Sequence, residues 1–231
     1  MKTLTVIQHT SADYLGLMED HLEGRRIRFV YNRPFTERSV VPQFKQIADG
    51  LVLLGGGPWG SAGPRNVPSL VEEVELCYAC LAAGLPVIGI GLGAQVLALA
   101  AGGSTVAEPL TFTTTYARRV DDDALNGYLP ARYPLVRYMR DRALPPADAR
   151  ILSVDEQDNP ALFQIGENAF GFSGHPGMKL AMAEDLIMEF EEVPDDTAAA
   201  LSELRALKTE IEDALVPIMT GLIQITALMR D

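Results

Sequence analysis

Three glycines at alternate positions mark the stretch in which residue types and spacing most clearly suggest chemistry. Residues 87–103 read VIGIGLGAQVLALAAGG, an apolar run that continues through the glycines into a helix-like segment. A strand, a tight turn and a helix in this order either hold a catalytic nucleophile or bind a phosphate. The centre of this turn is Gly91, which has no side chain to react.

The phosphate-binding interpretation rests on Gly89, Gly91 and Ala94, which match the G-x-G-x-x-A pattern of dinucleotide sites. That pattern normally follows the first strand of the fold, whereas several apolar runs precede this one. The acidic residue expected about 20 positions later would be Glu108. Because Glu108 follows no clear second strand of a nucleotide-binding unit, the sequence disfavours this interpretation.

The alternative is a nucleophile elbow, in which the pattern G-x-Nu-x-G lets a strained central residue project over a helix N-terminus. Residues 89–93 fit this pattern, with glycine in the nucleophile position. The N–H of the next residue in such an elbow helps to stabilise an oxyanion. The pattern therefore predicts an elbow backbone without its reactive side chain.

Cys77 and Cys80 are the only cysteines, and their CxxC spacing suggests a redox pair. Apolar residues at 70, 71, 74, 77, 78 and 81 follow a helical period, which places both cysteines inside a helix. A redox CxxC normally opens a helix instead, because the helix N-terminus lowers the thiol pKa. We expect a structural role for both.

Two of the three histidines carry weak signals. His9 follows the first apolar run and would lie at the sheet edge where α/β folds bind ligands. His21 falls on the expected solvent face of a helix. Histidine, cysteine and carboxylate residues show no metal-ligand spacing, so neither a metal nor another cofactor is expected.

The 231 residues suffice for one large domain or one domain with an appendage. The net charge of -12 argues against nucleic acid or an anionic membrane as the main partner, because both attract basic surfaces. No run approaches the 18 apolar residues of a membrane span, and the N-terminus lacks the features of a signal peptide. We expect a cytoplasmic protein.

The first half alternates strands and helices, which is typical of an α/β fold with a parallel sheet covered on both faces. The segment 40–50 is expected to form a short helix or turn. After residue 103 the pattern changes to short strands with turns at 158–160 and 166–168, which predicts an antiparallel extension. The expected strands of the first half are 4–8, 26–31, 50–57 and 85–90, and the expected helices are 11–24, 68–84 and 94–102.

The chain from 194 to 231 is expected to form a helical extension beyond a domain at 1–193. Asp195 or Asp196 is placed to cap a helix starting near Thr197. Pro217 is expected to kink that helix or split it in two. A coiled-coil-like apolar seam, interrupted only by Lys208, packs either on its own domain or on a second copy in a homodimer. The seam comprises residues 201, 204, 208, 211, 215, 218, 222, 225 and 229.

Three motifs in order, DGLVLLGGGP at 49–58, LPVIGIGLGAQVLALAAGG at 85–103 and GFSGHPG at 171–177, give the chain a specific resemblance. It resembles the class I glutamine amidotransferases, above all stand-alone members similar to the glutaminase part of GMP synthase. The resemblance extends from VIQH at the first strand to HP at 175–176 and leaves out the C-terminal helices. It implies a flavodoxin-like three-layer α/β sandwich.

In that family the elbow reads G-[IV]-C-x-G-x-Q, and a later strand ends in G-x-Q-F-H-P-E. The cysteine attacks the side-chain amide of glutamine, the histidine acts as its base, and the glutamate orients the histidine. The resemblance places His175 at the base and Gln95 at the glutamine that helps to hold substrate. It places Gly57 and Leu92 where backbone N–H groups form the oxyanion hole.

This sequence departs from the family at the catalytic positions. Gly91 replaces the cysteine, Gly177 replaces the glutamate, and Ser173 and Gly174 replace the usual Gln-Phe. Loss of the nucleophile from such a site costs several orders of magnitude in rate. His175 is then either a residual base, able to bind a ligand or activate water, or a residue packed under a loop. The glycines predict a wider, less charged cavity.

Three functions follow from these departures. The first is an amidotransferase-like pseudoenzyme that binds a small ligand, such as glutamine or a related metabolite, or a separate synthetase subunit. The second is an active amidotransferase or amide hydrolase with a rearranged or altered site, which includes an engineered glycine at position 91. The third is a scaffold protein that assembles through its C-terminal helices.

Overall fold

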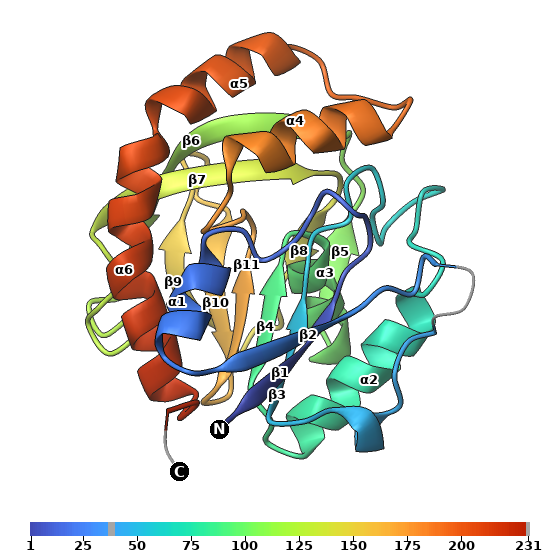
Figure 1. Cartoon of the computed structure of the whole chain (residues 1–231), viewed down its shortest axis with the longest axis vertical. Helices are drawn as coiled ribbons and strands as arrows, with labels where there is room; N and C mark the ends of the chain where they lie inside the picture. The colour runs from blue at the N-terminus through green and yellow to red at the C-terminus, as the bar shows by residue number, and fades with distance from the viewer. Residues whose placement is uncertain (37–39, 230–231) are drawn as a thin grey trace.

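The structure, a computed structural model, describes residues 1–36 and 40–229 and is built on a nine-stranded mixed sheet (Figure 1). The strand order is β2-β1-β3-β4-β11-β10-β9-β6-β7. Five neighbouring strands run parallel: β2 (Arg28–Asn32), β1 (Thr3–Ile7), β3 (Gly50–Leu53), β4 (Val87–Ile90) and β11 (Ala169–Phe172). Their carboxyl ends therefore share one edge of the sheet.

The rest of the sheet forms the predicted antiparallel extension. It consists of β10 (Pro160–Ile165), β9 (Arg150–Val154), β6 (Thr111–Arg119) and β7 (Arg132–Met139). Two short strands, β5 (Ser104–Val106) and β8 (Arg142–Leu144), pair separately. β11 joins the two halves, because it pairs parallel with β4 and antiparallel with β10.

Helices cover both faces of the sheet, which confirms the three-layer α/β sandwich. One face packs on α2 (Leu70–Ala82) and α3 (Leu92–Ala100), with Ile7, Leu51 and Leu53 in the shared core. The other packs on α1 (Met18–Gly24) and α6 (Lys208–Ile225), with Leu4 and Val6 turned toward them. The alternation of neighbouring strand residues between two cores explains why these strands are apolar throughout.

The helix expected at 11–24 is confirmed only over its second half, because α1 begins at Met18. Residues 8–17 form a loop, with a turn in which the Asp13 N–H donates to Thr10 Oγ1 and a left-handed Gly16. The segment at 40–50 holds only the short 3-10 helix η1 (Phe44–Gln46). The helical period of the loop misled the prediction, since its buried residues pack over the end of the sheet.

The C-terminal helices pack on their own domain, as one of the two interpretations proposed. Leu204 of α5 (Thr197–Ala206) and Ile211 of α6 lie in a core with strand residues, and Leu215, Ile218 and Leu222 lie in the main core. Figure 1 shows α6 running along one side of the molecule and α5 turning across its end, above α4 (Leu180–Glu189). The domain of the same chain therefore covers most of the apolar seam, Met229 excepted, and the homodimer stays a prediction.

The predicted split of the helix at Pro217 is wrong, while the alternative, a kink, stays a prediction. The break between the helices falls at Leu207, and α6 continues through Pro217. Leu215 and Ile218 are buried on either side of the proline, and this packing offsets the lost backbone hydrogen bond. Asp196 does precede α5, but its side chain makes no cap. Among the helices of the described residues, none combines the length and apolarity that crossing a bilayer requires.

Candidate functional site

Gly91 forms a sharp elbow between β4 and α3. Its backbone has φ +56° and ψ −113°, its N–H donates to the Phe172 carbonyl at 2.8 Å, and its carbonyl accepts from the Ala94 N–H at 3.0 Å. A Cβ placed on Gly91 would meet only Gly55 Cα, at an ordinary 3.5 Å. The elbow backbone is therefore intact, and it has room for the first carbon of a side chain.

The flanking glycines are required by close backbone contact. A Cβ on Gly89 would collide with the Gly93 carbonyl, and a Cβ on Gly93 would collide with the Leu53 carbonyl. The first turn of α3 thus crosses directly over the ends of β3 and β4. This contact is the physical reason for the alternating glycines, and it needs no bound phosphate.

The two expected oxyanion-hole donors lie on either side of the elbow. Leu92 opens α3, and Gly57 lies in the turn after β3 with φ +56°. Within residues 1–36 and 40–229, neither N–H has a hydrogen-bond acceptor. The side of Gly57 where a Cβ would project is closed by Phe190, Thr10 and α4. The donors are present, and the Cβ side of Gly57 is closed to a side chain.

His175 is held as a neutral imidazole by two backbone groups. Its Nε2 donates to the Tyr14 carbonyl at 2.7 Å, and its Nδ1 accepts from the Gly177 N–H at 3.1 Å. Since a carbonyl only accepts and an N–H only donates, these partners fix the tautomer. Burial lowers the pKa of His175 to about 4. The histidine is therefore uncharged at neutral pH and both ring nitrogens are occupied.

The predicted widening of the cavity is wrong at Gly174 and Gly177. A Cβ on Gly174 would lie 2.6 Å from the Val136 carbonyl, and a Cβ on Gly177 would lie 3.1 Å from the Met18 nitrogen. Strand β7 and the segment before α1 fill the space that larger side chains would take. The Tyr14 carbonyl, supplied by the same loop, now orients His175.

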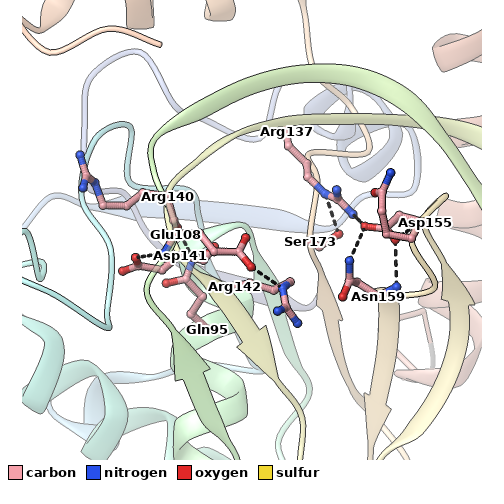
Figure 2. A network of polar contacts seen from close by, with 10 residues as sticks. Gln95, Glu108, Arg137, Arg140, Asp141, Arg142, Asp155, Asn159 and Ser173 are labelled. Atoms are coloured by element: carbon pink, nitrogen blue, oxygen red, sulfur yellow. Dashed lines mark hydrogen bonds and ion pairs between the residues drawn. The ribbon is translucent and has the colours of Figure 1, made fainter. Parts of the chain in front are cut away.

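Gln95 is fully buried and its amide is used inside the protein. Its Nε2 donates to the Arg140 carbonyl at 2.8 Å, and its Oε1 accepts from Ser61 Oγ at 2.5 Å. Figure 2 shows Gln95 beside Asp141, whose carboxylate accepts three further backbone N–H groups. The amide joins the loop after β3 to the turn between β7 and β8, so its observed contacts are structural.

Ser173 offers no replacement nucleophile in this geometry. Its Oγ accepts from Arg137 Nε at 3.2 Å, and Arg137 also donates to Asp155 at 2.7 Å (Figure 2). An arginine partner holds no lone pair with which to take the serine proton. The cavity that reaches Ser173 measures about 60 Å³, which is room for about two waters.

A buried histidine–carboxylate pair lies next to the elbow, and the sequence analysis singled out its histidine, His9, but missed its carboxylate, Glu73. His9 Nε2 lies 2.8 Å from Glu73 Oε2, and Ser69 Oγ donates to the other Glu73 oxygen at 2.5 Å. His9 Nδ1 contacts the Gly55 carbonyl at 3.0 Å. Burial lowers the pKa of His9, but Glu73 outweighs it and leaves that pKa raised. Glu73 was hidden from the sequence analysis because it looked like an exposed first-turn helix residue.

Asp13 completes this buried cluster. It is 3% exposed, one carboxylate oxygen contacts Gly55, and Oδ1 has no hydrogen-bond partner among the described residues. Burial raises the pKa of Asp13 to about 7, although His9 pulls it down. Asp13 lies in the loop that the sequence analysis expected to be helical. Nothing in the sequence therefore indicated that its side chain would be buried against Gly55. Gly55 lies against the Asp13 carboxylate, and its Cα is also the nearest atom to a Cβ placed on Gly91. Gly55 therefore separates Asp13 from the elbow.

The remaining candidates have ordinary environments. Cys77 and Cys80 are buried in the middle of α2, and burial raises the pKa of Cys80 to about 11. His21 lies on α1 beside Arg25, as expected of a partly exposed helix residue. Across the part of the chain that the structure describes, no cluster of three potential metal ligands is found.

The comparisons with known proteins identify the class to which this fold and elbow belong. The family model for class I glutamine amidotransferases matches residues 25–191. The chain belongs to the class I glutamine amidotransferase family.

Individual relatives agree with this assignment. A GMP synthase (glutamine-hydrolysing) of Aeropyrum pernix is 31% identical over 165 residues, which cover 69% of this chain and 31% of that protein. A carbamoyl phosphate synthase small chain of Vibrio vulnificus is 31% identical over 140 residues, covering 60% of this chain and 36% of that one. The chain thus spans about a third of the length of these relatives.

Solved structures share the fold over nearly the whole chain. A glutamine amidotransferase from Thermotoga maritima superposes with a TM-score of 0.80 at 22% identity, covering 97% of this chain and 98% of that one. A glutamine amidotransferase from Methylobacillus flagellatus gives 0.82 at 20% identity, covering 97% and 95%. A match to 97% of the chain includes the C-terminal helices, which therefore belong to the shared fold.

Proposed function

We propose that this chain is an amidotransferase-like protein that no longer hydrolyses glutamine by the cysteine mechanism and has been kept as a binding protein. One observation carries the proposal. The elbow residue Gly91 has no side chain, and the histidine that would serve it has both ring nitrogens hydrogen-bonded to Tyr14 and Gly177.

Each step of the covalent mechanism lacks its group. Attack on an amide carbon needs a thiolate, and the elbow presents only hydrogen atoms at that point. The base must accept the thiol proton and later give it to departing ammonia. His175 would first have to leave the Tyr14 carbonyl, and Gly177 supplies no carboxylate to stabilise the imidazolium. The oxyanion donors Gly57 and Leu92 remain as a feature suited to binding.

Binding has two candidate targets in this proposal. A small ligand with a carboxylate or amide oxygen would accept hydrogen bonds from Gly57 and Leu92 at the elbow. A separate synthetase subunit is the second target, because one relative is named as the small chain of a synthase.

The test is restoration of the nucleophile. Ammonia release from glutamine is measured for Gly91→Cys, for Gly91→Cys combined with Gly177→Glu, and for Gly91→Ala as the matched control. We expect all three at the rate of buffer, because His175 stays bound to Tyr14 and a side chain at Gly177 would press on the backbone of Leu17 and Met18. Turnover by Gly91→Cys alone would show that only the thiol is missing and that the base is functional.

Ligand binding is tested by thermal stability with glutamine, glutamate and nucleotides. A ligand at 100 times its dissociation constant adds about 2.7 kcal/mol to the free energy of unfolding. A rise in melting temperature with any one of them would support a ligand-binding role. Unchanged melting with all of them would leave the partner-binding role as the proposal.

A second candidate function, an amide hydrolase with a rearranged site, is favoured by one observation. Asp13 places an unpartnered buried carboxyl beside Gly55, next to the elbow, and its pKa of about 7 suits acid–base work. Asp13→Asn should abolish any amide hydrolysis that the protein shows. Hydrolysis that is unchanged in Asp13→Asn would contradict this candidate.

A further inference from the structure

A cavity of about 230 Å³ lies between the C-terminal helices and the loop that follows β11. Its walls are apolar and come from segments far apart in the sequence. They are formed by Leu17, Met178, Leu180, Leu204 and Ile211. Figure 1 shows the arrangement that creates the space, with α4 lying below α5 and α6 descending at their side.

The mouth of this cavity is cationic. Lys179 at the start of α4, Arg205 at the end of α5 and Lys208 at the start of α6 all line it. The side chains of Arg205 and Lys208 are 68% and 76% exposed, so their charges lie in solvent at the entrance. Lys179 lies with its Nζ 5.9 Å from the centre of the Tyr14 ring.

Nearby carboxylates offset part of this charge, but the cavity lining, with three cations and one carboxylate, stays net positive. Glu212 also lines the cavity, and its carboxylate lies 3.9 Å from Lys208. Glu184 lies 3.7 Å from Arg205. Both contacts are at the long limit of an ion pair, and exposed pairs of this kind are weak. Three cations around one cavity stand out in a chain whose net charge is -12.

We infer that this cavity binds a small amphipathic anion, with its apolar chain against Leu204 and Ile211 and its carboxylate among Lys179, Arg205 and Lys208. The apolar walls alone would accept any hydrocarbon, whereas the cationic side chains at the mouth favour a ligand with a negative charge. Arginine and lysine together suit a carboxylate, because the guanidinium donates two parallel hydrogen bonds and the ammonium adds a point charge. This site is separate from the elbow and does not depend on the function proposed there.

The volume of the cavity limits the length of the hydrocarbon chain that a bound ligand can have. At about 30 Å³ for each water-sized group, the cavity has room for about eight non-hydrogen atoms. A linear carboxylate of about six to eight carbons would therefore fill it while the head group stays at the mouth. A chain of sixteen carbons would not fit without displacing the helices.

The experiment is calorimetric titration of the full chain with octanoate, compared with 1-octanol and octylamine. The three probes share a chain and differ in head-group charge. We expect one site for octanoate, at least about tenfold weaker binding of 1-octanol, and binding of octylamine weaker still, since the cations at the cavity outnumber the lining carboxylate. Equal affinity for octanoate and 1-octanol, or no heat with octanoate at several millimolar, would overturn the inference.

Variants place the binding at this cavity. Lys208→Glu should weaken octanoate binding about three- to tenfold, in line with the reversal of one exposed charge. Lys45→Glu makes the same charge change on the exposed η1 segment and should leave binding unchanged. Leu180→Trp, at a half-buried wall position, should block the cavity while the melting temperature reports that the fold is intact. Equal binding by Lys208→Glu and Lys45→Glu would overturn the assignment.

Discussion

At the scale of single residues, backbone groups occupy both ring nitrogens of His175. The Tyr14 carbonyl accepts a hydrogen bond from Nε2 of His175, and the Gly177 N–H donates one to Nδ1 of the same ring. The one buried carboxyl with a free oxygen near the elbow belongs to Asp13, within the residues that the structure describes. The titration of Asp13 therefore reports directly on the altered site.

Asp13→Asn should change how stability depends on pH. The pKa of Asp13 rises from 3.8 to about 7 on folding because of burial. A raised folded-state pKa means that the stabilising proton is fully present below pH 3.8 and is lost as the pH rises through 7. The variant, which cannot ionise, should exceed the unmodified protein by on the order of 1.6 kcal/mol at pH 5 and by on the order of 4 kcal/mol at pH 8.

The measurement is chemical unfolding of both proteins at pH 5 and pH 8. His175 is common to both proteins and cancels in the difference, whereas the pKa of His9 should fall in Asp13→Asn because the Asp13 charge helps to raise it. Asp20→Asn, on exposed α1 surface, serves as the charge-matched control and should show no such difference. Equal stability of Asp13→Asn and the unmodified protein at pH 8 would mean that Asp13 is not held protonated.

At the scale of elements, the strand–helix crossing of β4 and α3 determines which glycines are essential. Gly93→Ala should cost at least about 3 kcal/mol, because its Cβ collides with the Leu53 carbonyl, which is rigid backbone. Gly91→Ala should cost about 1 to 2 kcal/mol, from the positive φ alone. Urea unfolding of the two variants gives the comparison. A larger loss for Gly91→Ala would mean that the elbow is closed to side chains.

The C-terminal helix α6 belongs to the main core in energetic terms. Leu222→Ala should lower the free energy of unfolding by about 2 to 5 kcal/mol, because Leu222 is 1% exposed among strand residues. Val216→Ala on the same helix is 51% exposed and should cost less than about 1 kcal/mol. Similar small losses for both variants, with a single unfolding transition, would contradict the packing of α6 on the sheet.

At the scale of the whole molecule, the alternation of strands and helices in the sequence predicted the fold. The sequence did not show which side chains the loops place next to one another. The alternation of apolar runs with helical periods predicted the sandwich because each strand is buried on both faces. The loop at 8–17 misled the prediction, since periodicity says nothing about tertiary packing. Glu73 and Asp13 were missed because burial of a charged residue depends on partners distant in sequence, His9 for one and Gly55 for the other.

The elbow shows the same limit within the site itself. The glycine spacing and the ordered motifs predicted its backbone, and φ +56° at Gly91 matches that prediction. The wide cavity expected from Gly174 and Gly177 is absent at those positions, because β7 and the residues around the start of α1 occupy the space. Removal of side chains creates a cavity only when the backbone around them stays in place.

The glutaminase rate of the unmodified protein, beside its His175→Gln variant, tests the central claim most directly. Ammonia release from saturating glutamine is followed for both proteins and for buffer alone. The loss of cysteine chemistry predicts three equal rates, because there is no thiolate to attack and His175 is held by Tyr14. Ammonia release above buffer that disappears in His175→Gln would contradict the account and show a working amidotransferase.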